Sequence, residues 1–252
     1  MIDLSLRNRL EKSALDQGFS ISLGESDGWL VFQAHAVPTR LVLSADTEGR
    51  YLVGTSHKGV GRELPDELQT APYANDGFDC FVAPSSSDLF RIIGRIWSLA
   101  RSLPNEPLAE FERLLKEAPS TTEVERLRKE RIGQNVFRSA LMDYWEKSCA
   151  VTGVQNPTLL RASHIIPWAT CESDEERLNV HNGLLLVATL DAAFDAGLIT
   201  FDDDGRILIS GKLSERDQIS SGIGEHMRLT RMNDEVRKRL AWHRAHLFKV
   251  GD

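Results

Sequence analysis

Cysteine is scarce in this chain of 252 residues, which contains Cys80, Cys149 and Cys171 and no others. These three are far apart and outside any C-x-x-C pair, so the sequence predicts neither a disulfide framework nor a four-cysteine zinc site. Such cysteine usage favours a reducing cytoplasm. The N-terminal segment lacks the apolar core of a signal peptide, and no run approaches the roughly 18 apolar residues of a membrane helix. We therefore expect a cytoplasmic protein with no membrane partner.

Positive charge is also limited, because 30 Lys+Arg face 37 Asp+Glu and the formal net charge is −7. This balance argues against a protein that holds nucleic acid through a general coat of basic charge. Residues 1–120 carry 12 basic and 17 acidic side chains, whereas residues 226–249 carry 7 Lys+Arg and 2 Asp+Glu. Any contact with a polyanion is therefore expected in the C-terminal half.

Hydrophobic periodicity predicts a mixed first half with antiparallel strands. The expected elements are a helix at 4–16, a three-stranded meander at 28–56, a loop from 57 to 79, one strand in FDCFVA, an apolar helix capped by residues 85–88, and a shorter helix at 107–118. The segment Ala118-Pro119-Ser120 is the predicted boundary between an N-terminal domain, 1–118, and a C-terminal domain, 119–252. Ser120 and Glu123 have capping-box spacing and are expected to open a long helix to about residue 147.

The second half combines a histidine with closely spaced carboxylates. A predicted strand carries His164, a loop follows, and a second strand at 184–187 leads into a short helix that starts near Thr189. Asp191 and Asp195 stand four residues apart, so both lie on one face of that helix. Two hard oxygen ligands beside a histidine suit Mg²⁺ or Mn²⁺.

Four motifs carry this arrangement, and in chain order they are CAVTG at 149–153, RASHIIPW at 161–168, NGLLL at 182–186 and LDAAFDAGL at 190–198. Their order and spacing resemble the HNH endonucleases, and especially the restriction-endonuclease-like branch. The resemblance covers about residues 134–198 and, more weakly, 240–248; residues 1–118 lie outside it. It implies an α+β chain whose C-terminal domain is a ββα-metal nuclease core embedded in helices, acting on DNA in a restriction system.

The resemblance also implies roles for individual residues. His164 corresponds to the general base, and Asn182 to the asparagine that pins the loop and orients the histidine. Asp191 corresponds to a metal ligand, and Asp195 to a further ligand or a structural carboxylate. Ser163 stands where many members have a stronger ligand, which leaves water, Ser163 and Asp195 as candidates for that coordination position. The expected cofactor is a divalent metal, Mg²⁺ or Mn²⁺, with no structural zinc.

Four side chains are candidate DNA contacts: Arg138, Arg161, Arg239 and His243. The two arginines near the expected site suit bidentate phosphate contacts, with a salt bridge as the alternative. Arg239 and His243 share a helical face, for which a plain solvated surface is the alternative. Restriction-type relatives imply double-stranded DNA, and a single site per chain favours a homodimer.

Two other functions remain open for this sequence. One is a degenerate HNH fold, disabled by Ser163, that binds DNA or a protein without cutting. The other is a nuclease gated by a ligand-sensing N-terminal domain. Asp202-Asp203-Asp204-Gly205 is interpreted as a hairpin turn rather than a calcium loop, and His181 as an exposed loop residue.

Overall fold

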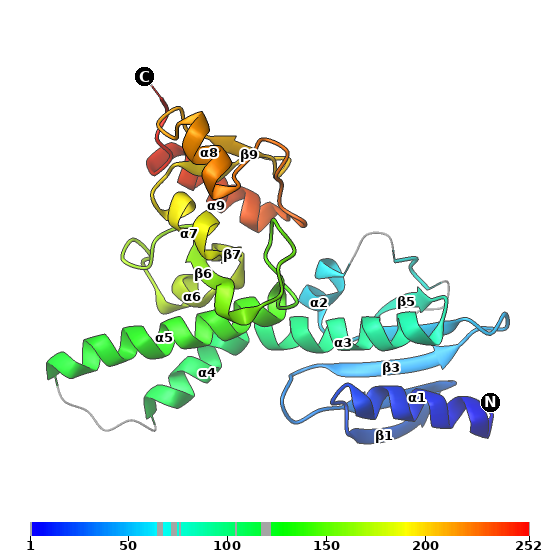
Figure 1. The fold of residues 1–252 in the computed structure, drawn as a ribbon. Helices are drawn as coiled ribbons and strands as arrows, with labels where there is room; N and C mark the ends of the chain where they lie inside the picture. Colours follow the sequence, from blue (N-terminus) through cyan, green and yellow to red (C-terminus); the bar gives the residue numbers. More distant parts are fainter. Residues whose placement is uncertain are drawn as a thin grey trace. The chain divides into compact units, whose positions relative to one another are not determined.

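The computed structural model describes residues 2–64, 68–71, 75, 77–103, 105–116 and 122–251, and for residues 122–126 it describes the backbone alone. The described chain is α+β, with helices and antiparallel sheets, as the sequence predicts (Figure 1). It divides into two compact units, Met1–Leu103 (unit 1) and Pro104–Asp252 (unit 2). No helix of the described residues is both long enough and apolar enough to cross a membrane.

Unit 1 is built on a five-stranded antiparallel sheet in the order β1-β2-β3-β4-β5. The strands are β1 (Ile21–Ser26), β2 (Trp29–Gln33), β3 (Arg40–Ala45), β4 (Tyr51–Thr55) and β5 (Asp79–Ala83). The predicted meander and the FDCFVA strand are confirmed, since the apolar residues of these runs line the core. The sequence interpretation missed β1, whose residues after Ile21 are all exposed and whose ladder is irregular between Ser22 and Gly24.

Two helices cover the sheet of unit 1. The helix α1 (Leu4–Asp16) packs on β2 and β3, and α3 (Ser86–Ser102) packs on β4 and β5. The Ser85 hydroxyl accepts a hydrogen bond from the Asp88 N–H at 3.1 Å, which confirms the predicted cap. The expectation of a loop from 57 to 79 is wrong in part, because α2 (Lys58–Glu63) forms there, capped by the His57 ring.

Unit 2 begins with two helices, α4 (Asn105–Lys116) and α5 (Thr122–Tyr144). The predicted domain boundary after residue 118 and the predicted cap at Ser120 both fall outside the described residues. Whereas the sequence interpretation placed a helix at 107–118 in the N-terminal domain, α4 contacts α5 and α6 (Asp174–Leu178). This packing places α4 in unit 2.

The centre of unit 2 is a two-stranded ladder followed by a short helix. The strands are β6 (Leu160–His164) and β7 (Gly183–Val187), and α7 (Ala188–Asp195) follows without a break. α5 packs against both strands, and α7 contacts β6 and β7. Between the strands lie α6 and the 3-10 turn η2 (Val180–Asn182), with a second turn, η1 (Pro157–Leu159), before β6.

A hairpin and two helices complete unit 2: β8 (Ile199–Phe201), β9 (Ile207–Ile209), α8 (Glu215–Ser221) and α9 (Asp234–His246). Asp202 Oδ1 accepts hydrogen bonds from the backbone N–H groups of Asp204 and Arg206, at 2.9 and 2.8 Å. Gly205 follows with a positive φ of 78°. These features confirm the predicted hairpin turn at 202–205, because the acidic side chain closes the turn itself.

Candidate active site

The ladder of β6 and β7 sets the direction of the two site residues on β6. Ser163 pairs with Leu184, and His164 pairs with Gly183. Because successive side chains of a strand point to opposite faces, Ser163 and His164 diverge. Ser163 lies against α7, whereas His164 lies against α5, where it stacks on the ring of Phe137. The two residues are therefore neighbours along the chain that serve opposite faces of the strand end.

On the α7 face, the Ser163 hydroxyl donates a hydrogen bond to Oδ1 of Asp191. Ser163 is 2% exposed, so this bond satisfies a buried hydroxyl and fixes the Asp191 carboxylate beside the end of β6. The serine that replaces a stronger ligand in the expected motif is thus already bonded to the proposed metal ligand. Asp191 lies in the first turn of α7, where the helix dipole favours negative charge.

Asp195 lies one turn further along α7. The residue as a whole is exposed, but its carboxyl group is partly desolvated, which raises its pKa to about 6. The negative charge of Asp191 adds to this rise. Because Asp191 and Asp195 stand one turn apart on α7, their two negative charges repel each other. A cation between them would relieve that repulsion.

On the α5 face, the half-buried ring of His164 is held on three sides. It stacks on Phe137 with ring centroids 3.8 Å apart, meets Trp168 edge-on at 5.7 Å, and places Nε2 2.9 Å from the carbonyl oxygen of Arg177. A carbonyl only accepts, so Nε2 carries the proton of the neutral ring and Nδ1 carries the lone pair. Burial lowers the pKa of His164 from its usual value, which keeps that lone pair available at neutral pH.

The glycine opposite His164 allows this packing. A Cβ at Gly183 would overlap the ring of Phe137 and the side chain of Leu141. Both residues belong to α5, so the helix can approach the ladder closely only where β7 has no side chain. This gives the Asn182-Gly183 pair of the motif a packing reason in addition to its position at a turn.

Asn182 is fully buried and ties the loop between the strands to the start of β7. Its Oδ1 accepts from the Ile166 N–H at 2.9 Å, and its Nδ2 donates to the Ile166 carbonyl at 3.1 Å. The backbone N–H of Ile165 also donates to the Asn182 carbonyl at 3.0 Å. Asn182 therefore fixes the chain immediately after His164, which is the place that the resemblance assigns to it.

Arg177 was missed by the sequence analysis and organises the same loop. Its guanidinium donates to the carbonyls of Trp168 and Cys171, pairs with Asp174 at 3.0 Å, and lies 5.7 Å from the Trp168 ring centroid. Its own carbonyl holds His164. No sequence signal pointed to it, because the contact to His164 uses a backbone atom that every residue type has.

The donor set at the carboxylates can be tested against the expected cation. Among the residues that the structure describes, no group of three His, Cys, Asp or Glu side chains is placed to hold a metal. Mg²⁺ is commonly held by one or two carboxylates, with water and substrate phosphate completing its shell. Asp191 and Asp195, with Ser163 beside them, fit that pattern and no richer one. The cysteines are buried free thiols.

The two arginines near β6 are bonded to the backbone. Arg138 of α5 donates to the carbonyls of Leu160 and Pro157, both at 2.8 Å, and Arg161 donates to Thr158 and Leu160 at 2.9 and 3.0 Å. Among the described residues, neither forms an ion pair with an acidic side chain. No acidic side chain among the described residues therefore offsets their positive charge, which lies next to the strand that carries the site. A phosphate contact there remains a prediction.

The expected DNA contacts on α9 are less accessible. His243 is fully buried, stacked on Phe194, and bonded through Nδ1 to Thr200 Oγ1 at 3.0 Å and through Nε2 to the Phe194 carbonyl at 3.3 Å. A phosphate cannot reach it, so the DNA contact predicted for His243 is wrong. Arg239 is ion-paired with Glu235 at 2.9 Å, and its phosphate contact stays a prediction. His181, expected to be exposed, is 8% exposed and packs on Tyr144.

Ion pairing also changes how the basic segment 226–249 is interpreted. Four of its cations pair with acids of the first turn of α9 or of the hairpin: Arg237 with Asp234, Lys238 and Arg239 with Glu235, and Arg244 with Asp203. The local excess of positive charge is therefore largely compensated. Arg138 and Arg161, beside the ladder, are better placed for a phosphate backbone than α9 is.

Comparison with known families agrees with this geometry. Residues 149–202 match the family model described as HNH endonuclease. No curated protein matches the chain. The matched segment runs from the first motif to the β8–β9 turn and includes β6, β7 and α7, the elements that carry Ser163, His164, Asn182, Asp191 and Asp195. The match confirms, over residues 149–202, the resemblance to HNH endonucleases that the motifs predict.

Proposed function

We propose that the protein is a metal-dependent DNA endonuclease, with His164 as general base and Asp191, with Asp195, as the cation-binding pair. The observation that carries the proposal is the His164 ring, which is held by Phe137 and the Arg177 carbonyl while its Nδ1 has no hydrogen-bond partner among the described residues. A base must be positioned and must keep a free lone pair near neutral pH. His164 meets both requirements, next along the chain to the serine that anchors Asp191.

The reaction assigns a task to each group. His164 takes a proton from water through Nδ1, the water oxygen attacks phosphorus, and the bond from phosphorus to the leaving 3′ oxygen breaks. A divalent cation, when bound, supplies charge neutralisation at the scissile phosphate and the leaving oxygen. Ser163 holds the Asp191 carboxylate in place, and Asn182 and Arg177 hold the loop that orients the ring. Arg138 and Arg161 attract the flanking phosphates.

The biological setting belongs to the same proposal. The restriction-like order of the motifs supports double-stranded DNA as substrate and a defence role in the cytoplasm. A homodimer would bring two sites to the two strands, because each chain carries one ββα unit.

Supercoiled-plasmid nicking in Mg²⁺ or Mn²⁺ tests this proposal. His164→Ala is expected to lower the nicking rate by about 10²–10⁴-fold, the usual contribution of a positioned base. The matched control is His226→Ala, which removes an exposed histidine of unit 2. Equal rates in wild type and His164→Ala, with both proteins folded by circular dichroism, would contradict the assignment.

A second candidate is a degenerate HNH module that binds DNA or a protein without cutting. The specific observation in its favour is that the described residues offer two carboxylates and a serine rather than three strong ligands. DNA binding without any metal-stimulated nicking, unchanged by His164→Ala, would support this alternative. A nuclease gated by unit 1 would instead show faster cutting by a fragment that contains unit 2 alone.

A further inference from the structure

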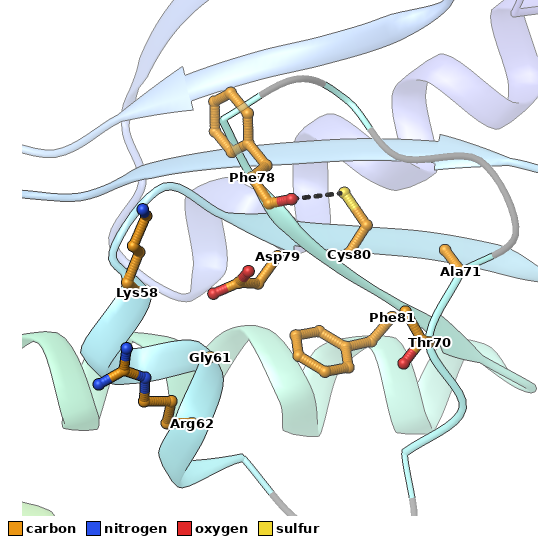
Figure 2. Close-up of a pocket in the computed structure, with 9 residues that line it drawn as sticks. All are labelled: Lys58, Gly61, Arg62, Thr70, Ala71, Phe78, Asp79, Cys80 and Phe81. Atoms are coloured by element: carbon orange, nitrogen blue, oxygen red, sulfur yellow. Dashed lines mark hydrogen bonds between the residues drawn. The ribbon is translucent and has the colours of Figure 1, made fainter.

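Unit 1 contains a pocket of about 610 Å³ between α2 and the edge of its sheet. A volume of this size lies within the range of small-molecule sites, about 300–1,000 Å³. Figure 2 shows Asp79 and Phe81 projecting from β5 toward α2, the helix that carries Lys58 and Arg62, while the Cys80 thiol points to the other side of the strand. Alternation along β5 accounts for this division of side chains.

The two cations that line this pocket lack an acidic partner among the residues that the structure describes. Several other cations of unit 1 have one: Arg7 pairs with Glu25, Lys12 with Asp16, Arg50 with Asp46 and Arg91 with Asp88. Within the described part of the chain, no acidic side chain pairs with Lys58 or Arg62. Arg40 likewise has no acidic partner among the described residues. Its guanidinium carbon lies 5.8 Å from the ring centroid of Phe78, another residue that lines the pocket. Lys58 and Arg62 thus bring two positive charges, neither paired with an acid among the described residues, to one pocket of an acidic unit.

One carboxylate faces these cations without bonding to them. Asp79 is exposed and, within the described part of the chain, makes no side-chain hydrogen bond or ion pair. Its carboxylate lies against the backbone of α2, because a Cβ at Gly61 would overlap it. Asp79 therefore presents free acceptor oxygens to the pocket, on the side of β5 that also carries the ring of Phe81. A ligand that uses these features needs an anionic group, N–H donors and a flat apolar body.

We propose that this pocket binds a single nucleotide, with the base against Phe81, its amino edge on Asp79, and its phosphate on Lys58 and Arg62. Bases of any identity stack on aromatic rings, carboxylates accept from exocyclic amino groups, and paired cations hold phosphate. The nucleotide has two possible sources, a free molecule or a nucleotide exposed from DNA. The second source rests on the proposed endonuclease function; the first does not.

Binding to the full-length protein without metal tests the proposal directly. The probes are dGMP, dCMP and dTMP by calorimetry, and a fluorescein-labelled 12-nucleotide DNA, single-stranded and duplex, by anisotropy. We expect Arg62→Ala to weaken binding of dGMP about tenfold, the loss typical of one charge-assisted hydrogen bond. Arg9→Ala is the matched control, because Arg9 is an exposed cation of α1 whose side chain has no acidic partner among the described residues.

Asp79→Asn gives a readout that a merely structural role would not produce. Wild type is expected to prefer dGMP and dCMP, which have exocyclic amino groups, over dTMP, which has none. Asp79→Asn should reduce this preference while keeping phosphate affinity. Gly61→Ala, which pushes a methyl group against the Asp79 carboxylate, should act in the same direction. Both variants are checked for folding by circular dichroism, and Asp79→Asn changes no packing volume.

The arms of the experiment identify the source and the failure. Competition between dGMP and the labelled DNA assigns the pocket to a nucleotide in DNA, whereas tight dGMP binding without competition assigns it to a free nucleotide. Absence of nucleotide and DNA binding, or equal affinities in Arg62→Ala, Asp79→Asn and Arg9→Ala, would overturn the proposal. Nicking that depends on His164 would persist in that case, so failure of the pocket and failure of the nuclease assignment are distinguishable.

Discussion

Two histidines of unit 2 have similar neighbours but different expected roles. His164, at the end of β6, stacks on Phe137 with centroids 3.8 Å apart; His243, in α9, stacks on Phe194 at 4.0 Å. Each places Nε2 near a backbone carbonyl, and burial lowers the pKa of each ring. The difference lies at Nδ1, which is bonded to Thr200 in His243 and, within the described residues, has no hydrogen-bond partner in His164.

That difference distinguishes a structural histidine, His243, from a candidate general base, His164. His243 uses both ring nitrogens and is fully buried, so its neutral ring is a polar core residue that joins α9 to α7 and β8. His164 uses one nitrogen and remains half-buried at the end of a strand. Stacking and a lowered pKa are therefore poor guides to function by themselves. The free lone pair is the feature that a general base needs.

Glutamine substitution at each histidine is the sharpest test of this comparison. A glutamine amide can still donate to a carbonyl, but it cannot take a proton from water. We expect His164→Gln to lower plasmid nicking by about 10²–10⁴-fold. His243→Gln should keep the wild-type rate per folded molecule, measured well below its melting temperature. A larger loss of activity in His243→Gln than in His164→Gln would reverse the two assignments.

The Asp191 carboxylate, which Ser163 holds at the end of β6, should matter almost as much as His164. Asp191→Asn removes the charge that Ser163 fixes in place, so we expect the nicking rate to fall on the order of 10²–10³-fold, in the range of other lost electrostatic groups. Mn²⁺ affinity, followed by calorimetry, should fall in parallel. Asp204→Asn, at the exposed hairpin tip, is the matched control. Unchanged Mn²⁺ binding in Asp191→Asn would remove this residue from the cation site.

Stability should show the reverse order of the two histidines. His243→Ala removes a stacked ring, two hydrogen bonds and a filled core volume, and we expect a loss of about 3 kcal/mol in the free energy of unfolding. His164→Ala should cost less, because its ring is only half-buried. Urea denaturation followed by circular dichroism measures both values. If His164→Ala proves the more destabilising, the His164 ring is the structural one of the pair.

Acid should destabilise unit 2 through His243. Burial lowers the pKa of this ring to about 4 in the folded state, against about 6.5 in an unfolded chain. The contribution of the neutral His243 ring to the free energy of unfolding is complete above pH 6.5. It is lost as the pH falls toward 4, and the loss reaches up to about 3 kcal/mol. Asp195, with its pKa raised to about 6, acts in the opposite sense, since its protonation relieves repulsion as the pH falls from 6.

Melting temperatures between pH 7 and pH 4 test this balance. His243→Gln should flatten the acid limb of the curve, and Asp195→Asn should steepen it, because each substitution removes one of the two opposing titrations. Identical curves for wild type and His243→Gln would show that the ring is not the titrating group.

The smallest effect is expected at the phosphate contacts. Arg161→Ala should weaken binding of any duplex by a similar factor and reduce the slope of log affinity against log salt by about one. Arg216→Ala, an exposed arginine of α8, is the matched control. The measurement is fluorescence anisotropy over a salt series without metal. A slope equal to that of wild type would leave Arg161 with its backbone contacts alone.

Local patterns predicted much of the fold. The helix at 4–16, the cap at Ser85 and the strands β2 to β5 follow from side-chain periodicity and turn chemistry, which act over a few residues. The pattern failed where local signals were weak. β1 has little buried surface, and α2 contains two glycines, Gly59 and Gly61, that disfavour a helix on propensity alone.

The site shows the same division between local and distant information. The motif order located His164, Asn182 and Asp191 on the strand, turn and helix where the structure has them. The Ser163–Asp191 hydrogen bond joins residues 28 positions apart. The contact of Arg177 with His164 uses its backbone carbonyl, a group that every residue type has. Neither could be derived from spacing.

By itself, the sequence of this chain determined an α+β protein with a segment similar to HNH endonucleases, because short motifs encode a strand, a turn and a helix together with the side chains they carry. Only the tertiary structure decided which histidine keeps a free nitrogen, which cations stay unpaired and where β5 and α2 enclose a pocket. Those properties depend on burial and on partners distant in sequence. Composition and periodicity contain no record of them.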